Sequence, residues 1–258
     1  MTKKYYLGID IGGSYIKAAL VSDAKRIFFE RVPTPKNRRE FETQLKSFMT
    51  KVSRVSKPVG IGVALAGIVD TKKGTLIKAP NMKFMDGWNA KKFFSQFRVS
   101  VKIENDARCF LLAEAKEGAG KNKRNLIGVV IGTGIGGAIM ENGKLKHGAH
   151  GSAGEFGHML LNSNKSWEEV AGWKGFKKLG DRSDIVGMGV ADIINAFDPE
   201  MVILGGGGVY AKHFNLAKTK RFAKKFIVSP IAKKTPIVKG KLGESAQAIG
   251  AALLFSKG

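Results

Sequence analysis

A carboxylate followed by a pair of glycines stands at the end of the first strand-like run of the sequence. Asp10 precedes Gly12 and Gly13, and Ser14 and Lys17 follow closely. Glycines let backbone N–H groups approach phosphate oxygens, while a hydroxyl and a lysine add a donor and a positive charge. A carboxylate in this place can hold Mg²⁺ through water, because Mg²⁺ keeps most of its hydration shell. A plain glycine-rich hairpin explains the motif equally well when it is taken alone.

A second glycine turn contains Gly132, Thr133 and Gly134 and offers another cradle for phosphate. The run also fits the G-x-G-x-x-G dinucleotide fingerprint. That fingerprint must open a helix, whereas residues 137–140 lead into Asn142-Gly143, a strong hairpin signal. We therefore interpret the run as a hairpin turn and not as a Rossmann motif.

A third glycine run follows a short apolar strand near residue 204. It consists of Gly205, Gly206, Gly207 and Gly208. A strand that ends in bare backbone lets a flat ligand lie directly against the chain. This run is therefore a further candidate binding surface.

Two polar residues stand where a predicted strand, 99–103, meets a predicted helix, 106–116. In open α/β sheets this junction is a ligand position. Asp106 can accept a proton from a substrate hydroxyl, and Asn105 can hydrogen-bond another hydroxyl. Helix capping fits both residues as well, and it is the interpretation that the pattern favours when it is taken alone.

A further group of polar residues contains Glu155 and His158, with Glu168 ten residues after His158. Two carboxylates and an imidazole are good acceptors for a polyhydroxylated ligand. A solvated loop or a metal site is the alternative. The spacing of Glu155 and His158 supplies one half of a metal site without a partner, which disfavours metal binding.

Hydrophobic spacing and turn residues predict the elements that position these motifs. Strands are expected at residues 5–11, 15–21, 26–32, 59–66, 99–103, 126–132, 137–141 and 201–204, and helices at 38–55, 88–97, 106–116, 167–179, 184–197, 211–226 and 245–255. Each half of the chain opens with a hairpin around a glycine turn. We therefore predict two α/β halves around a shared cleft.

Composition excludes several classes of protein. The chain has 258 residues and one Cys, too few cysteines for an internal disulfide or a Cys-rich zinc site. Its net charge of +23 makes nucleic acid a candidate partner. The basic residues are spread out and lack aromatic interleaving, which disfavours a dedicated nucleic-acid role.

The sequence shows no targeting signal. The first strand reaches Asp10 too soon for a signal peptide, and the apolar stretch 127–140 is too short for a membrane span. We therefore expect a cytoplasmic protein.

Taken together and in this order, the motifs resemble the ROK family of sugar kinases and regulators from about residue 8 to residue 254. The resemblance implies an α/β, two-lobed actin-like ATPase (ribonuclease H-like) fold with the active site in the interlobe cleft. It implies an N-terminal lobe over 1–105, onto which a helix at 245–258 packs back, and a C-terminal lobe over 106–244. It also implies ATP-dependent phosphorylation of a hexose or amino-hexose at the 6-hydroxyl, with ATP and Mg²⁺ as cofactors.

The resemblance also assigns roles to residues. Asp106 falls on the catalytic base, and Asp10 on the residue that holds Mg²⁺ through water. The residues expected to bind ATP are Gly12, Gly13, Ser14 (where the family more often has Thr), Lys17, Gly132, Thr133, Gly134, Gly205, Gly206 and Gly207. Those expected to bind the sugar are Asn81, Asn105, Asp106, Glu155, His158 and Glu168. We expect no membrane partner and no specific nucleic acid, and a homodimer is left open.

One departure from the family pattern concerns zinc. Most members follow the Glu-x-Gly-His element with a Cys-rich zinc loop, whereas residues 160–169 contain no Cys and Cys109 lies elsewhere. We therefore expect no structural zinc and interpret Cys109 as core packing.

Alternative functions are a sugar-responsive transcriptional regulator and a non-catalytic sugar-binding protein. The regulators carry an N-terminal DNA-binding domain, and the first phosphate motif begins too early, at Asp10, to leave room for one. Both phosphate motifs and Asp106 are intact, which argues against an inactive relative.

Overall fold

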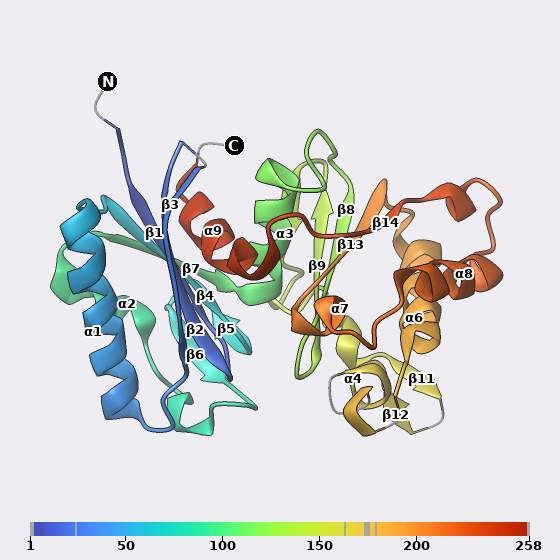
Figure 1. The fold of residues 1–258 in the computed structure, drawn as a ribbon, viewed down its shortest axis with the longest axis horizontal. Helices are drawn as coiled ribbons and strands as arrows, with labels where there is room; N and C mark the ends of the chain where they lie inside the picture. The colour runs from blue at the N-terminus through green and yellow to red at the C-terminus, as the bar shows by residue number, and fades with distance from the viewer. Residues whose placement is uncertain (1–2, 24, 163, 173–175, 179, 257–258) are drawn as a thin grey trace. The chain divides into compact units, whose positions relative to one another are not determined.

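The chain folds into two compact units in the structure, a computed structural model that describes residues 3–23, 25–162, 164–172, 176–178 and 180–256. Unit 1 contains residues 1–113 and 245–258, and unit 2 contains residues 114–244 (Figure 1). The division falls inside helix α3 (Asp106–Glu117), whereas the boundary expected from the sequence lies at the start of that helix.

Unit 1 is built on a five-stranded mixed sheet in the order β3-β2-β1-β4-β7. Its strands are β1 (Tyr6–Ile11), β2 (Tyr15–Ser22), β3 (Lys25–Pro33), β4 (Gly60–Leu65) and β7 (Ser100–Asn105). β1, β2 and β3 form an antiparallel meander, and β4 and β7 run parallel to β1. The carboxyl ends of β1, β4 and β7 therefore meet at one edge of the sheet.

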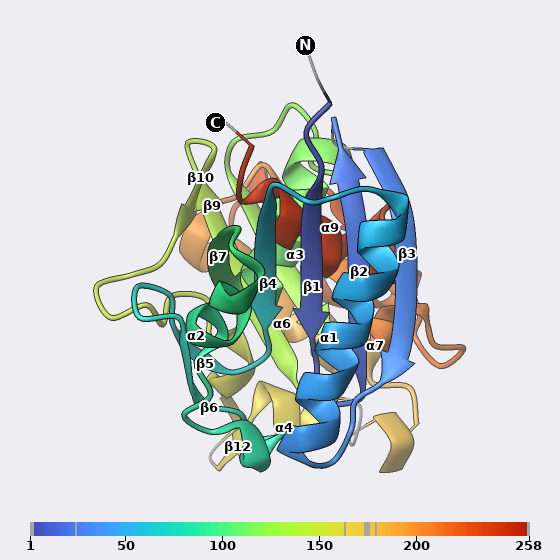
Figure 2. The ribbon, with the colours of Figure 1, turned by 90° about the vertical axis from the view of Figure 1, so that its left-hand side faces the viewer.

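Helices cover both faces of this sheet (Figure 2). α1 (Arg38–Val55) begins at the N-cap Asn37 and buries one apolar stripe against the core. α9 (Ala246–Leu253) lies on the other face so closely that a Cβ at Gly8 or Gly62 would overlap its backbone. Arg26 and Lys102 donate hydrogen bonds of 2.8 Å to Ser245 Oγ and to the Leu254 carbonyl, at the two ends of α9.

Smaller elements complete unit 1 between β4 and β7. They are β5 (Ile68–Asp70), β6 (Thr75–Lys78), the 3-10 turn η1 (Lys83–Met85), α2 (Ala90–Phe94) and the 3-10 turn η2 (Ser95–Phe97). β5 and β6 form an antiparallel pair. Aromatic side chains from this region pack edge to face within the unit 1 core.

Unit 2 repeats the arrangement of the first sheet, in the order β10-β9-β8-β13-β14. Its strands are β8 (Leu126–Ile131), β9 (Ile135–Glu141), β10 (Lys144–Lys146), β13 (Met201–Gly205) and β14 (Ile237–Lys239). The expected hairpin between β9 and β10 is confirmed, because Asn142 and Gly143 take φ angles of 53° and 78°, as a tight primed turn requires.

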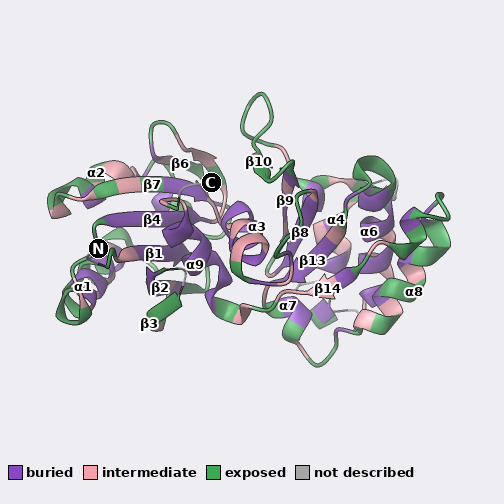
Figure 3. Cartoon of the chain, turned by 90° about the horizontal axis from the view of Figure 1, so that it is seen from above, coloured by how far each residue is buried: buried purple, intermediate pink, exposed green. Residues whose placement is uncertain are grey.

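The helices and minor elements of unit 2 enclose a second core, seen as buried residues in Figure 3. They are the 3-10 turn η3 (Phe156–His158), β11 (Leu160–Asn162), β12 (Lys165–Ser166), α4 (Trp167–Ala171), α6 (Ser183–Phe197), α7 (Gly207–Tyr210), α8 (Leu216–Phe226) and the 3-10 turns η4 (Ala232–Lys234) and η5 (Gly243–Ser245). None of the helices among the described residues is long and apolar enough to cross a membrane.

Four expected helices are shorter in the structure, and one of them is the helix expected at 245–255, which is observed as α9 (Ala246–Leu253). The helix expected at 88–97 begins at Ala90, after the N-cap Asn89, and ends in a 3-10 turn. The helix expected at 167–179 is interrupted after Ala171, because Gly172 takes an extended backbone. Residues 176–178 are helical as expected, and residues 173–175 and 179 lie outside the described residues. The helix expected at 211–226 begins at Leu216, because Asn215 caps it.

Candidate functional site

The turn between β1 and β2 carries a buried ion pair. Asp10 and Lys17 are register partners on the two strands, and Lys17 Nζ lies 3.0 Å from Asp10 Oδ2. Asp10 is only 4% exposed. The Asp10 carboxylate therefore lies at the carboxyl end of β1, and one of its oxygens is paired with the Lys17 ammonium group.

The backbone of this turn is held from the neighbouring strand. Thr34 donates its hydroxyl to the Gly12 carbonyl at 2.6 Å, and its N–H to the Ser14 carbonyl at 3.0 Å. A Cβ added at Gly13 would lie 2.7 Å from Asn81 Cβ, so the turn is in close contact with Asn81. Sequence reasoning missed Thr34; extending the β2–β3 hairpin one residue past Pro33 would have placed it beside the turn.

Asn105 is the residue that caps α3. Its Oδ1 accepts hydrogen bonds from the N–H groups of Ala107 at 2.9 Å and Arg108 at 3.2 Å, while its Nδ2 donates to the Gly67 carbonyl at 3.4 Å. Asp106 Oδ1 accepts the N–H of the adjacent Ala107 at 2.9 Å. Capping therefore accounts for Asn105 and leaves the position of Asp106 unexplained.

A buried ion pair stabilises the junction between β7 and α3. Arg108 Nη1 lies 3.2 Å from Glu104 Oε1, with both side chains about 5% exposed. Glu104 Oε1 also accepts the Asn105 N–H at 2.8 Å. Breaking a buried pair of this kind is costly, so Glu104 and Arg108 hold Asn105 and Asp106 at the strand end. Sequence reasoning did not single out Arg108.

The carboxyl group of Asp106 has a strongly perturbed pKa. Burial raises its pKa from 3.8 to about 7, and the negative charge of Asp10 acts in the same direction. The Ala107 N–H and the charge of Lys17 lower it in part. A carboxyl group whose pKa lies near neutrality is well matched to take up a proton during catalysis.

Asp10 is the residue of unit 1 that could hold a hydrated metal ion. The described part of the chain contains no group of three or more His, Cys, Asp or Glu side chains that could hold a metal. Mg²⁺ at phosphate sites needs no such cage, since it keeps several waters and binds one or two carboxylates together with substrate phosphates. The buried carboxylate of Asp10 at the end of β1 fits that requirement.

The corresponding turn of unit 2, between β8 and β9, is in contact with Glu168. The Gly132 N–H donates to the Gly134 carbonyl at 2.8 Å and closes the turn. Glu168 Oε2 accepts the N–H of Ile135 at 3.1 Å. A Cβ at Gly134 would overlap the Glu168 carboxylate, so only glycine allows this approach. Glu168 is thus in direct contact with the glycine turn and holds the backbone that follows it.

The glycine run after β13 lies beside that turn. β8 and β13 are parallel neighbours, so their carboxyl ends meet at the same edge of the unit 2 sheet. Gly206 has a φ of +85°, and a Cβ there would overlap the carbonyl of Ile131. Gly207 is exposed and has no neighbour within 4 Å of an added Cβ. Two stretches of bare backbone therefore lie together.

Glu155 and His158 lie on an exposed turn of unit 2. The His158 side chain is 68% exposed and the Glu155 side chain 47% exposed, with Nε2 and Oε2 4.0 Å apart. The turn is anchored on β9, because a Cβ at Gly157 would overlap the Ile135 carbonyl. The N–H of Ile135 also donates to Glu168. The turn that carries Glu155 and His158 and the side chain of Glu168 therefore both contact Ile135.

The structure therefore forms two clusters from the residues that the sequence singles out. The unit 1 cluster contains Asp10, Gly12, Gly13, Ser14, Lys17, Asn81, Asn105 and Asp106. The unit 2 cluster contains Gly132, Thr133, Gly134, Glu155, His158, Glu168, Gly205, Gly206 and Gly207. Each cluster joins carboxyl ends of parallel strands to a glycine turn, an arrangement suited to binding phosphate and hydroxyl groups.

Known proteins resemble the chain over nearly its whole length. It is 29% identical to an N-acetyl-D-glucosamine kinase of Haemophilus influenzae, covering 97% of this chain and 99% of the relative. It is 26% identical to a glucokinase of Streptomyces coelicolor, covering 95% and 96%. Among solved structures, a ROK family glucokinase from Streptomyces griseus in complex with glucose and AMPPNP has a TM-score of 0.86 at 24% identity, covering 97% and 98%.

These comparisons establish the fold and the family. The similarity to the Streptomyces griseus structure confirms the expected actin-like ATPase fold. The sequence model of the ROK family matches residues 6–175 and 179–258, which includes the glycine turns of both units and the strand-to-helix junction at Asp106. The chain therefore belongs to the ROK family.

Proposed function

We propose that the protein is an ATP-dependent sugar kinase that phosphorylates a hexose or an amino-hexose at its 6-hydroxyl. The observation that carries the proposal is Asp106, a carboxyl group with a pKa of about 7 at the end of β7, beside the cap residue Asn105. The similarity to two sugar kinases, which covers nearly the whole of this chain and of each relative, supports the same activity.

Asp106 is the general base in this mechanism. It accepts the proton of the sugar hydroxyl while the hydroxyl oxygen forms a bond to the terminal phosphorus of ATP and the bond to ADP breaks. General bases contribute about 10²–10⁴-fold to rate when their pKa lies near the working pH. Asn105 caps α3, so Asp106 is left available for the sugar.

Phosphate binding falls to the glycine turns and to Lys17. Phosphoryl transfer depends mainly on positioning and charge neutralisation, since little covalent chemistry is left to the protein. Backbone N–H groups near Gly13 and Gly134 bind phosphate oxygens, and Lys17 adds positive charge. The glycine run at 205–207 binds the adenosine side. When bound near Asp10, Mg²⁺ supplies neutralisation of the phosphate charge.

Sugar binding uses amide, carboxylate and imidazole groups. The residues that we propose for this role are Asn81, Asn105, Glu155, His158 and Glu168. Support comes from their positions, because Asn81 touches the first glycine turn and Glu168 touches the second. These contacts couple the groups that hold the sugar to those that hold the nucleotide.

A coupled ADP-release assay across glucose, N-acetylglucosamine, N-acetylmannosamine, mannose and fructose tests the proposal. We expect turnover with at least one of these sugars, and phosphate on O6 of the product by NMR. The 6-deoxy analogue of the best substrate is the matched control and should release no ADP. Turnover with none of the sugars, or equal turnover with the 6-deoxy analogue, would contradict the proposal.

A further inference from the structure

One stretch of unit 2 carries charge of a single sign. Residues 201–243 contain nine Lys and one Arg but no Asp or Glu, and so hold ten of the protein's 23 net positive charges. Surface segments that serve only solubility normally mix both signs. A long stretch of one sign indicates a surface that attracts an anionic partner.

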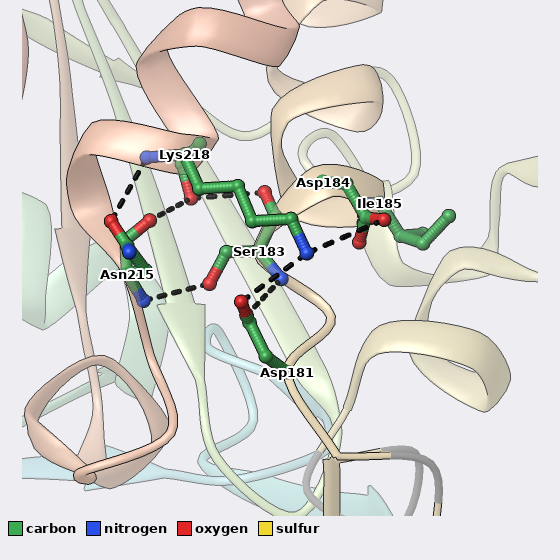
Figure 4. A network of polar contacts seen from close by, with 7 residues as sticks. Asp181, Ser183, Asp184, Ile185, Asn215 and Lys218 are labelled. Atoms are coloured by element: carbon green, nitrogen blue, oxygen red, sulfur yellow. Dashed lines mark hydrogen bonds and ion pairs between the residues drawn. The ribbon is translucent and has the colours of Figure 1, made fainter.

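The start of α8 lies in a polar network that fixes the helix on α6 (Figure 4). Asn215 caps α8 by accepting the Lys218 N–H at 3.0 Å, and its own N–H donates to Ser183 Oγ at 2.7 Å. Lys218 Nζ lies 3.2 Å from Asp181 and 3.6 Å from Asp184. The charge of Lys218 is thus balanced inside the unit.

Hydrogen bonds from α6 also hold the chain that follows α8. Asn195 of α6 donates to the Phe226 carbonyl at 3.0 Å and accepts the Val228 N–H at 3.0 Å. Ile227 and Ala232 point inward, with exposed fractions of 2% and 7%. This bracing fixes the backbone between the end of α8 and η4.

Two aliphatic side chains nevertheless point away from the core. Val228 is 81% exposed and Ile231 is 82% exposed, the highest values for large hydrophobic residues in the described part of the chain. Their neighbours Ile227 and Ala232 are buried, so this loop presents one apolar side to solvent. A rigid loop with this pattern has little ordering entropy to lose when a partner covers it.

Four lysines flank these aliphatic groups and complete a surface that we call the basic tip. It consists of Lys224, Lys225, Val228, Ile231, Lys233 and Lys234. These residues belong to the end of α8 and the loop beyond it, whose backbone can be followed from the α8 label in Figures 1 and 3. All four lysines are exposed, and none makes an ion pair with another described residue.

We propose that the basic tip docks on the surface of a bilayer that contains anionic phospholipids. The lysines contact lipid phosphates, while Val228 and Ile231 enter the boundary between head groups and acyl chains. A nucleic acid would leave the two aliphatic groups unused, because bases stack on aromatic rings. A second copy of this chain would place like charges against each other. Docking of this kind needs no membrane-spanning helix, but it would revise the expectation from the sequence that the protein has no membrane partner.

Vesicle flotation at physiological salt tests this docking. We expect the protein to bind vesicles of phosphatidylcholine mixed with phosphatidylglycerol, and not phosphatidylcholine alone. The double variant Val228→Ser/Ile231→Ser should bind about tenfold more weakly, because its apolar groups no longer enter the interface. Lys233→Gln/Lys234→Gln should bind about 30-fold more weakly, since each lysine near an anionic surface contributes about a fivefold gain.

Matched variants in unit 1 control for total charge and exposed apolar area. Lys36→Gln/Lys46→Gln removes the same charge, and Ile27→Ser/Val55→Ser removes side chains that are 50% and 51% exposed. Both should bind vesicles like the wild type. All variants should keep the wild-type melting temperature and turnover in solution, so the result does not depend on the proposed function.

Two further measurements separate this proposal from other partners. Val228→Ser/Ile231→Ser should bind duplex and single-stranded DNA as the wild type does, and sedimentation velocity should reveal no self-association through the tip. Failure to bind the anionic vesicles, or tip variants that bind them like the wild type, would overturn the proposal. So would DNA binding or dimerisation that requires Val228 and Ile231.

Discussion

Replacing Asp106 by Asn separates its catalytic role from a structural one. Asn105 already provides the cap of α3, through the N–H groups of Ala107 and Arg108 at 2.9 and 3.2 Å. The variant keeps the size and polarity of the side chain but cannot take up a proton. We therefore expect sugar affinity to be largely retained while kcat falls by at least about 10²-fold, the signature of an interaction used mainly in the transition state.

The same substitution should make the protein more stable at high pH. The pKa of Asp106 is raised in the folded state, from 3.8 to about 7, so its ionisation opposes folding. The wild type therefore has its full stability from this group below pH 3.8 and loses it as the pH rises through about 7. This pKa difference limits the loss in the free energy of unfolding to roughly 4 kcal/mol. The actual loss should be smaller, because the Asp106 side chain is only half-buried.

Melting temperatures of the wild type and Asp106→Asn, measured from pH 4 to pH 8 with turnover and sugar affinity, test both expectations. The stability advantage of the variant should be small at pH 4 and should grow toward pH 8. A near-normal kcat would remove Asp106 from the mechanism. A stability difference that does not change with pH would refute the raised pKa.

Three further predictions concern backbone, metal and charge. Gly206→Ala should lower the free energy of unfolding by about 1–3 kcal/mol in urea melts, because φ is +85° and Ile131 leaves no room, whereas Gly207→Ala should change it little. Metal analysis of chelator-washed protein should detect no stoichiometric zinc, since Cys109 is the one cysteine and is buried; one tightly held zinc per chain would contradict this. Duplex DNA should bind weakly, with an affinity that falls steeply as salt rises; tight, sequence-selective binding would instead indicate a regulator.

Elements with strong local signals were predicted accurately. The helix at 38–55 has the bounds expected, because apolar residues recur at helical spacing after a good N-cap, Asn37. The hairpin at Asn142-Gly143 formed because both residues tolerate positive φ. The helix expected at 211–226 was wrong at its start, because Asn215 caps the helix and α8 begins only at Leu216.

Features that depend on distant parts of the chain had no comparable signal. β14 has three residues and is recognisable as a strand only through its pairing with β13. The contact of Glu168 with Gly134 joins elements 34 positions apart, and Thr34 reaches the Gly12 carbonyl across a hairpin. Residue types at the candidate site could therefore be predicted from motifs, whereas the contacts that hold them could not.

The position of α9 constrains the order in which the chain can fold during its synthesis. β1 and β4 pack against Ala248 and Ala251 of this helix, which the ribosome produces only after all of unit 2. Until then, one apolar face of the first sheet has no cover, and an exposed face of that kind invites aggregation or chaperone binding. Unit 2 is continuous in sequence and can fold without this delay. β1 thus leaves the ribosome before unit 2 but belongs to the unit that is completed after it.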